Sequence, residues 1–231
     1  MRFNVRYLLI ILAVSFCALQ YPSSALAIIC PNQPEVTIFS EDTETIHRIC
    51  QGSEKALASL ALYGLQPKRQ IFIEIVERGI DNHGYQAYGS YDSRSDKIKI
   101  MSYSSILLHY ENPVMYDETF DTVHYDGAVA HEITHAVFHH HIQSASPGTA
   151  PQEYLAHAIQ LSVLPDDRRD GIISRMDVSA WLPGDAISDI YMALEPGRFA
   201  VKSYKHLTTT DDPAGFIKIL LNSKWFYVYI P

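Results

Sequence analysis

Short stretches of alternating apolar and polar residues dominate the first half of the chain beyond its apolar N-terminus, a pattern typical of half-buried β-strands. Strands are predicted at residues 35–39, 70–76, 85–91 and 97–101. Between the first two strands, apolar residues recur at helical spacing from about residue 42 to residue 62, and Gly64 is expected to end this helix. Turn-forming residues at 81–84 and 92–96 join the later strands and indicate antiparallel pairing. The first half therefore predicts a small, mostly antiparallel sheet with one helix.

Helical periodicity replaces this alternation after Pro113. The predicted helices cover residues 120–141, 151–164, 186–194 and 213–221. Residues 143–150 are rich in Ser, Pro and Gly and predict a loop, and the charged residues 165–171 predict a second loop. Strands that precede helices in this way indicate an α+β fold. Since neither a repeat nor a long linker interrupts residues 28–231, we expect them to form a single domain.

The first 27 residues have the three parts of an export signal. Arg2 and Arg6 precede an apolar stretch that ends at Leu19, and Ala25-Leu26-Ala27 resembles a small-x-small cleavage site. The apolar stretch is short for a bilayer span of about 20 residues, so we expect cleavage after Ala27 rather than retention as an anchor. The mature protein is expected to be periplasmic or secreted, with no stable membrane association once the signal is removed.

Cysteine content and charge narrow the environment and the partners further. Because Cys17 leaves with the signal, only Cys30 and Cys50 remain in a chain that enters an oxidising compartment, and we expect a disulfide between them. The full sequence has a formal net charge of −8. The charged residues of the signal are all basic, so its removal makes the mature chain more acidic still. A mature chain this acidic disfavours nucleic acid and anionic lipid surfaces as partners.

The segment His131-Glu132-Ile133-Thr134-His135 carries the clearest chemistry, because it reads His-Glu-x-x-His within a predicted helix. Residues four apart lie on one face of an α-helix, so both imidazoles can bind a single zinc ion. Glu132 flanks the same site and is suited to act as general base. The pentapeptide therefore predicts a hydrolytic centre with one Zn²⁺.

A catalytic zinc site usually has three protein ligands and an open position for water, so a third ligand is expected downstream. Glu153 follows the first predicted loop, near the start of a helix that can return antiparallel and direct a carboxylate at the ion. Here the chain resembles the gluzincin group of zinc metallopeptidases, the thermolysin-like proteins, over residues 120–160. The resemblance implies a zincin-like metallopeptidase domain with His131, His135 and Glu153 as zinc ligands and Glu132 as base. It also implies that residues 97–101 form an edge strand on the substrate side.

Two other histidines leave alternatives open. His141 has the metzincin spacing, but a continuous helix turns it about 240° away from the zinc face, and Phe138 stands where that family breaks the helix with glycine. Ser174-Arg175-Met176 would have to supply the Met-turn of that family. We favour Glu153 over His141 as the third ligand. His157 stands where the gluzincins often carry an acid or a small residue. It could hydrogen-bond a ligand, orient substrate or be a polar residue on the helix flank. We favour the last of these and do not count His157 as a ligand.

The remaining candidates have simpler interpretations. The run His139-His140-His141 is expected to be a solvated helix end, where cations meet the negative end of the helix dipole. Tyr204 and His206 are candidates, by residue type alone, for stabilising an oxyanion.

These features together predict an exported zinc metallopeptidase that hydrolyses a peptide or protein substrate through a zinc-bound water, with Glu132 as general base. The alternative is a non-catalytic exported module that binds metal or protein on the same fold. Glu132 favours the enzyme, because metal binding alone requires no carboxylate between the two histidines.

Overall fold

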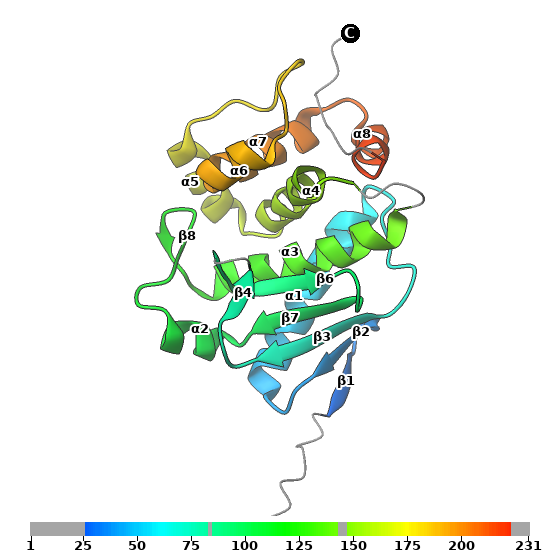
Figure 1. Ribbon diagram of the computed structural model, residues 1–231, viewed down its shortest axis with the longest axis vertical. Helices are drawn as coiled ribbons and strands as arrows, with labels where there is room; N and C mark the ends of the chain where they lie inside the picture. Colours follow the sequence, from blue (N-terminus) through cyan, green and yellow to red (C-terminus); the bar gives the residue numbers. More distant parts are fainter. Residues whose placement is uncertain (1–25, 83–84, 143–146, 223–231) are drawn as a thin grey trace, which may run out of the picture.

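The computed structural model describes residues 26–82, 85–142 and 147–222, in which strands precede most of the helices (Figure 1). The strands are β1 (Ala27–Cys30), β2 (Gln33–Phe39), β3 (Ile71–Val76), β4 (Ile80–Asn82), β5 (Tyr85–Ala87), β6 (Gly89–Asp92), β7 (Lys97–Met101), β8 (Val114–Met115) and β9 (Glu118–Thr119). The helices are α1 (Thr43–Ala61), α2 (Tyr103–His109), α3 (Thr122–His141), α4 (Thr149–Ser162), α5 (Asp166–Met176), α6 (Asp189–Leu194), α7 (Pro196–Thr209) and α8 (Pro213–Leu220). The fold is α+β, as predicted.

The N-terminal segment is described only from residue 26 onward. The expected signal at residues 1–27 therefore lies outside the described residues except for its last two, and Cys17 lies outside them as well. Among the described residues, none of the helices is both long enough and apolar enough to span a membrane.

Five strands form a mixed sheet in the order β1-β2-β3-β7-β6. β1 pairs antiparallel with β2, and β6 pairs antiparallel with β7. The pairings of β2 with β3 and of β3 with β7 are parallel, because longer connections separate these strands along the chain. The ribbons β4–β5 and β8–β9 are antiparallel. The meander predicted around residues 92–96 is therefore confirmed as the β6–β7 hairpin.

The edge strands of this sheet are β1 and β6, which corrects the expectation that residues 97–101 form an edge. β7 lies between β3 and β6, with Ile98 and Ile100 buried on one face and Lys97 and Lys99 exposed on the other. It is the half-buried strand that its alternation predicts, but its pairing with β3 occupies the backbone groups that an edge strand leaves free.

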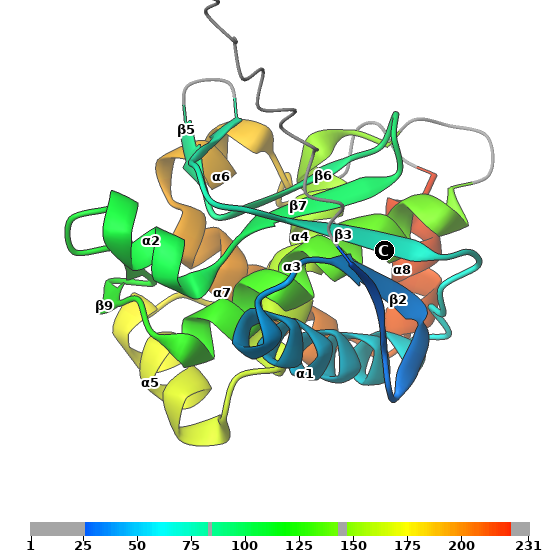
Figure 2. The same ribbon diagram turned by 90° about the horizontal axis from the view of Figure 1, so that it is seen from below.

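Helices α1 and α3 pack together on one face of the sheet, as Figure 2 shows. α3 also contacts β6 and β7. On its far side α3 packs against α4, which in turn packs against α7, and Figure 1 shows these helices stacked away from the sheet. α3 thus lies between the sheet and the outer helices, which accounts for the apolar residues around its histidines.

The boundaries of α1 follow from its capping residues. The carboxylate of Asp42 accepts hydrogen bonds from the backbone amides of Glu44 and Thr45 at 3.1 and 3.3 Å, which satisfies free amides of the first turn. Gly64 follows the last turn with a φ of 74°, a left-handed conformation that favours glycine. Helices α3, α4, α6 and α8 also lie within three residues of their predicted limits.

Residues 165–171 are predicted as a charged loop. Residues 166–171 instead form the first part of helix α5. Asp166 and Asp167 lie in its first turn, where negative charge is favourable at the positive end of the helix dipole. Only Ile172 and Met176, four residues apart, are buried. The loop prediction was wrong because so short an apolar stripe is hidden among charged residues.

Helix α7 has no counterpart among the predicted elements. Pro196 is its first residue, where the missing amide hydrogen costs no helical hydrogen bond. Its buried stripe mixes apolar and polar residues, namely Phe199, Ala200, Val201, Ser203, His206 and Leu207. Ser203 accepts a hydrogen bond at 3.1 Å from the indole nitrogen of Trp181, which satisfies one of these polar groups.

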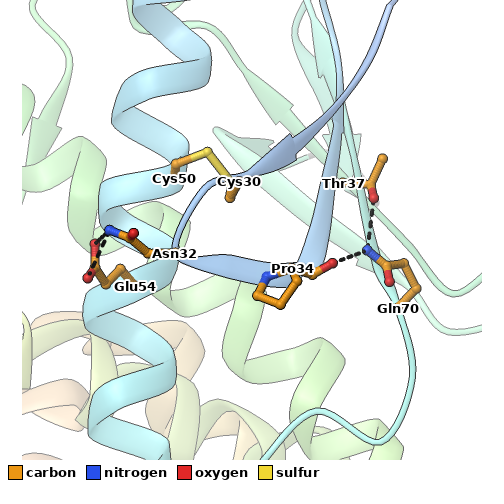
Figure 3. Close-up of a disulfide and its surroundings, with 7 residues drawn as sticks. All are labelled: Cys30, Asn32, Pro34, Thr37, Cys50, Glu54 and Gln70. Carbon is orange, nitrogen blue, oxygen red and sulfur yellow. Dashed lines mark hydrogen bonds between the residues drawn. A yellow bond between two sulfur atoms is a disulfide. The ribbon is translucent and has the colours of Figure 1, made fainter.

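Cys30 at the end of β1 and Cys50 in α1 form the expected disulfide, with their Cα atoms 5.4 Å apart (Figure 3). The bond ties the β1–β2 hairpin to α1. On the other side of the hairpin, the Gln70 amide donates hydrogen bonds to Thr37 Oγ1 at 2.8 Å and to the Pro34 carbonyl at 3.1 Å. The N-terminal hairpin is therefore fixed to both the helix and the sheet.

Candidate metal centre

The register of α3 is set by reciprocal hydrogen bonds at its start. The carboxylate of Asp121 accepts hydrogen bonds from the backbone amides of Val123 and His124 at 3.0 and 3.1 Å, and the His124 ring accepts one from the Asp121 amide at 3.3 Å. From this start the helix runs without interruption through His131 and His135. The two imidazoles therefore lie on one face, one turn apart.

Three side chains meet between α3 and α4. Nε2 of His131 lies 3.0 Å from Nε2 of His135 and 3.2 Å from Oε2 of Glu153. Nε2 of His135 lies 3.4 Å from Oε1 of Glu153. One ligand atom from each of these residues lies within 4.8 Å of the others, and this triad is the one group of possible metal ligands found in the described part of the chain.

The spacing of these atoms suits a metal ion. Zinc binds imidazole nitrogen and carboxylate oxygen at about 2.0–2.2 Å, which places two ligands of a tetrahedral site about 3.3 Å apart. The separations of 3.0, 3.2 and 3.4 Å are close to this value. The structure thus brings together the three residues predicted as ligands.

Gln160 orients the first of these ligands, and the sequence patterns did not identify it. Nδ1 of His131 donates a hydrogen bond to Oε1 of Gln160 at 2.9 Å, while the Gln160 amide nitrogen lies 3.1 Å from the sulfur of Met115. Because this bond keeps a proton on Nδ1, Nε2 is the nitrogen that would bind a metal once a cation displaces its own proton. Gln160 lies seven residues after Glu153 and so shares its face of α4, a spacing that could have indicated this role.

The charges within the triad favour a bound cation. Burial opposes ionisation of Glu153, but the charges and hydrogen bonds of His135 and His131 hold its pKa well below the usual value. Burial also opposes protonation of His131, yet the hydrogen bond and charge of Glu153 raise the pKa of that ring to about 9. Glu153 is therefore a carboxylate at neutral pH.

Glu132 lies beside the triad without belonging to it. Its side chain is buried against β6, where it accepts a hydrogen bond from the backbone amide of Tyr91. Burial raises the pKa of Glu132, and the neighbouring His131 and His135 offset only part of this effect. A Cβ added at Gly89 would lie 2.6 Å from Cγ of Glu132, so glycine leaves the space that this side chain occupies.

His157 is part of the centre and not a residue of the helix flank, which corrects the expectation for it. Its ring packs edge-on against His131, with centroids 4.7 Å apart, and its Nε2 lies 3.8 Å from Oε2 of Glu153. Burial, followed by the charge of His131, lowers the pKa of His157 to about 3. It reaches the centre because α4 packs directly on α3.

The histidines at the end of α3 lie away from the triad. Nε2 of His141 donates a hydrogen bond to the carbonyl of Gln66 at 2.8 Å, so this ring is directed at the chain that follows α1. His140 is buried and its Nε2 lies 3.5 Å from Oδ1 of Asp96. The expectation of a fully solvated helix end is therefore wrong for His140, because the β6–β7 turn covers it.

Three further candidates have other roles. Met176 ends helix α5, so residues 174–176 form no Met-turn. Nδ1 of His206 lies 2.7 Å from the hydroxyl oxygen of Tyr154, within hydrogen-bonding distance. Neither His206 nor Tyr204 is among the residues that line the cleft at the triad.

The triad opens into a cleft of about 920 Å³. Its walls come from the edge strand β6, the β8–β9 hairpin, helices α3 and α4, and the junction of α6 with α7. Glu132 and His157 line the cleft together with the triad. A molecule in this cleft would therefore contact the three possible ligands, a buried carboxylate and a further imidazole.

Comparisons with known proteins bear on this arrangement only at the level of the family. Neither a curated protein nor a solved structure matches the chain. The model of one family matches residues 36–229. This range includes the candidate centre, namely His131, Glu132, His135, Glu153 and His157. The chain thus belongs to this family of unknown function, DUF6639.

Proposed function

We propose that this protein is an exported zinc-dependent metallopeptidase. The observation that carries the proposal is the position of Glu132, a buried carboxylate that shares a cleft with the possible ligands His131, His135 and Glu153. A metal-storage or structural site requires only the ligands. A carboxylate that lies beside the ligands but does not itself bind the metal is suited to acid–base catalysis.

The triad, Glu132 and Gln160 each have a part in this chemistry. His131, His135 and Glu153 would hold the zinc, which would supply a Lewis acid able to polarise a carbonyl and to make water acidic near neutral pH. Glu132 accepts the proton of the attacking water on its carboxylate and passes it to the nitrogen of the leaving amine. The Tyr91 amide fixes the Glu132 carboxylate, and Gln160 fixes the ring of His131.

The form of the cleft supports an extended peptide as the substrate. β6 forms one wall and is an edge strand of the sheet, and among the described residues no strand pairs with its outer side. A peptide in extended conformation can pair with such an edge through its backbone, beside the triad. The net charge of −8 makes nucleic acid an unsuitable partner.

Export is part of the proposal and rests on the N-terminal segment and on the cysteines. Arg2, Arg6 and the apolar residues that follow have the order of a secretory signal. The disulfide between Cys30 and Cys50 supports an oxidising compartment, the bacterial periplasm or the extracellular space.

Glu132→Gln tests the proposal, because it removes the base and keeps the shape of the side chain. The purified mature chain is screened against a peptide library with and without chelator, and the variant is compared on the best substrate. We expect chelator-sensitive hydrolysis by the wild type and loss of it in Glu132→Gln, with one zinc per chain in both proteins. Hydrolysis that survives the substitution would overturn the assignment of the base.

Metal analysis of two further variants checks the ligand set. Glu153→Ala is expected to lose the zinc, and His141→Ala, a matched control outside the triad, is expected to keep it. A wild-type chain that binds zinc but cleaves no library peptide would favour the non-catalytic module instead.

A further inference from the structure

His157 approaches Glu153 from within the same helix. The two residues are one turn apart on α4, so their side chains share the face that packs against α3. Nε2 of His157 lies 3.8 Å from Oε2 of Glu153, a contact longer than a hydrogen bond. The same Oε2 lies 3.2 Å from Nε2 of His131, and Oε1 lies 3.4 Å from Nε2 of His135. The carboxylate is thus placed between a histidine of the triad and a histidine outside it.

The surroundings of His157 hold its ring in this orientation. One side packs edge-on against His131, and another packs against Phe199 of α7, with ring centroids 5.8 Å apart. Its Nδ1 is buried and has no hydrogen-bond partner among the described residues. Gln160, three residues later on the same helix, also interacts with this ring, and Nε2 is directed at Glu153.

A metal-binding carboxylate is commonly oriented by a hydrogen-bond donor that does not itself bind the metal. Groups that contact ligands from outside set their orientation, and their loss typically lowers metal affinity about 10- to 100-fold. Gln160 has this position toward His131, and His157 has the corresponding position toward Glu153. His157 itself falls outside the group of side chains whose ligand atoms meet within 4.8 Å.

We propose that His157 is a positioning residue of the metal centre, whose Nε2–H orients the Glu153 carboxylate so that two histidines and one glutamate bind the metal and a further position stays open. This inference rests on the proposed function for the presence of the metal, but it concerns binding and coordination rather than turnover. Its consequences can therefore be measured without a substrate.

The test compares His157→Phe with His157→Gln in the full mature chain. Phenylalanine keeps a planar ring between His131 and Phe199 but has no N–H, whereas glutamine keeps an N–H donor. Zinc affinity is measured by competition with a chelator, and Co²⁺ is added as a spectroscopic probe of coordination. We expect His157→Phe to bind Zn²⁺ about 10- to 100-fold more weakly and to alter the visible Co²⁺ spectrum. His157→Gln should stay within a few-fold of the wild type.

Further measurements separate a positioning role from other causes. Thermal unfolding of the metal-free proteins controls for a general loss of stability, and His141→Phe is the matched histidine outside the centre. Wild-type affinity and spectrum in His157→Phe would overturn this inference and leave the proposed function standing. X-ray absorption that counts three imidazoles on the wild-type metal would also overturn it, since His157 would then be a ligand. A wild-type chain that binds neither ion would overturn both proposals.

Discussion

At the scale of single residues, the lack of a side chain at Gly89 leaves the space that the Glu132 carboxylate occupies. A Cβ at position 89 would lie 2.6 Å from Cγ and 2.8 Å from Oε1 of Glu132, closer than these atoms can pack. Because pairing with β7 holds the backbone of β6, Gly89→Ala should displace the carboxylate instead of the strand. We expect kcat/KM for peptide hydrolysis to fall about 100-fold, the scale of a misplacement of about 1 Å, with zinc content unchanged.

A double-mutant comparison shows whether this loss acts through Glu132. Glu132→Ala removes Cγ and every atom beyond it, which are the atoms nearest to the new Cβ. Gly89→Ala should therefore cost the residual hydrolysis of the Glu132→Ala background much less than it costs the wild type. Equal losses in the two backgrounds would mean that Gly89 acts elsewhere.

Spacing along one helix is what made part of the site predictable at this scale. His131, Glu132 and His135 share a helix, so their geometry follows from 3.6 residues per turn alone. Glu153 required one further assumption, that the chain returns after the loop. Gly89 was missed because its contact with Glu132 depends on which strand of the β6–β7 hairpin lies outermost, and local alternation carries no such information.

At the scale of elements, the disulfide joins the first hairpin to α1. Cys30 and Cys50 are 20 residues apart, and a cross-link over such a loop lowers the entropy of the unfolded chain. Cys30→Ala/Cys50→Ala should lower the free energy of unfolding by about 3 kcal/mol. Urea unfolding of the variant and the wild type, both without reductant, measures the difference.

A control separates the cross-link from local packing. Reduction of the wild type should lower its unfolding midpoint as the double substitution does, while reductant should leave the midpoint of the variant unchanged. Equal midpoints for oxidised and reduced wild type would contradict a stabilising role for the bond.

Elements were predictable where the pattern was long and regular. α3 has caps and many buried positions, whereas α5 shows two buried residues in a charged stretch and α7 includes Ser203 and His206 in its buried stripe. The order of the strands was not predictable, because parallel pairing of β2, β3 and β7 depends on how α1 and the hairpins pack.

At the scale of the whole molecule, the helical half packs on the sheet through α3, and this packing buries several imidazoles. His124, His140 and His206 are each at most 9 % exposed, and His139 is half-buried. Burial lowers the pKa of all four rings below the usual 6.5. They contribute a common pH dependence to the stability of the fold.

The sign of that dependence follows from proton binding. Below pH about 6.5 the unfolded chain takes up protons on these rings that the folded protein does not, so the free energy of unfolding falls as the pH falls toward the lowered pKa values. His131, whose pKa is raised, acts in the opposite direction, but it is one ring against these four. We therefore expect a lower urea midpoint at about pH 5.5 than at about pH 7.5, measured with chelator present because metal binding has its own pH dependence. His124→Gln removes one of the four groups and should make the difference between the two midpoints smaller. A wild-type midpoint that is the same at both pH values would show that the buried rings are not coupled to folding in this way.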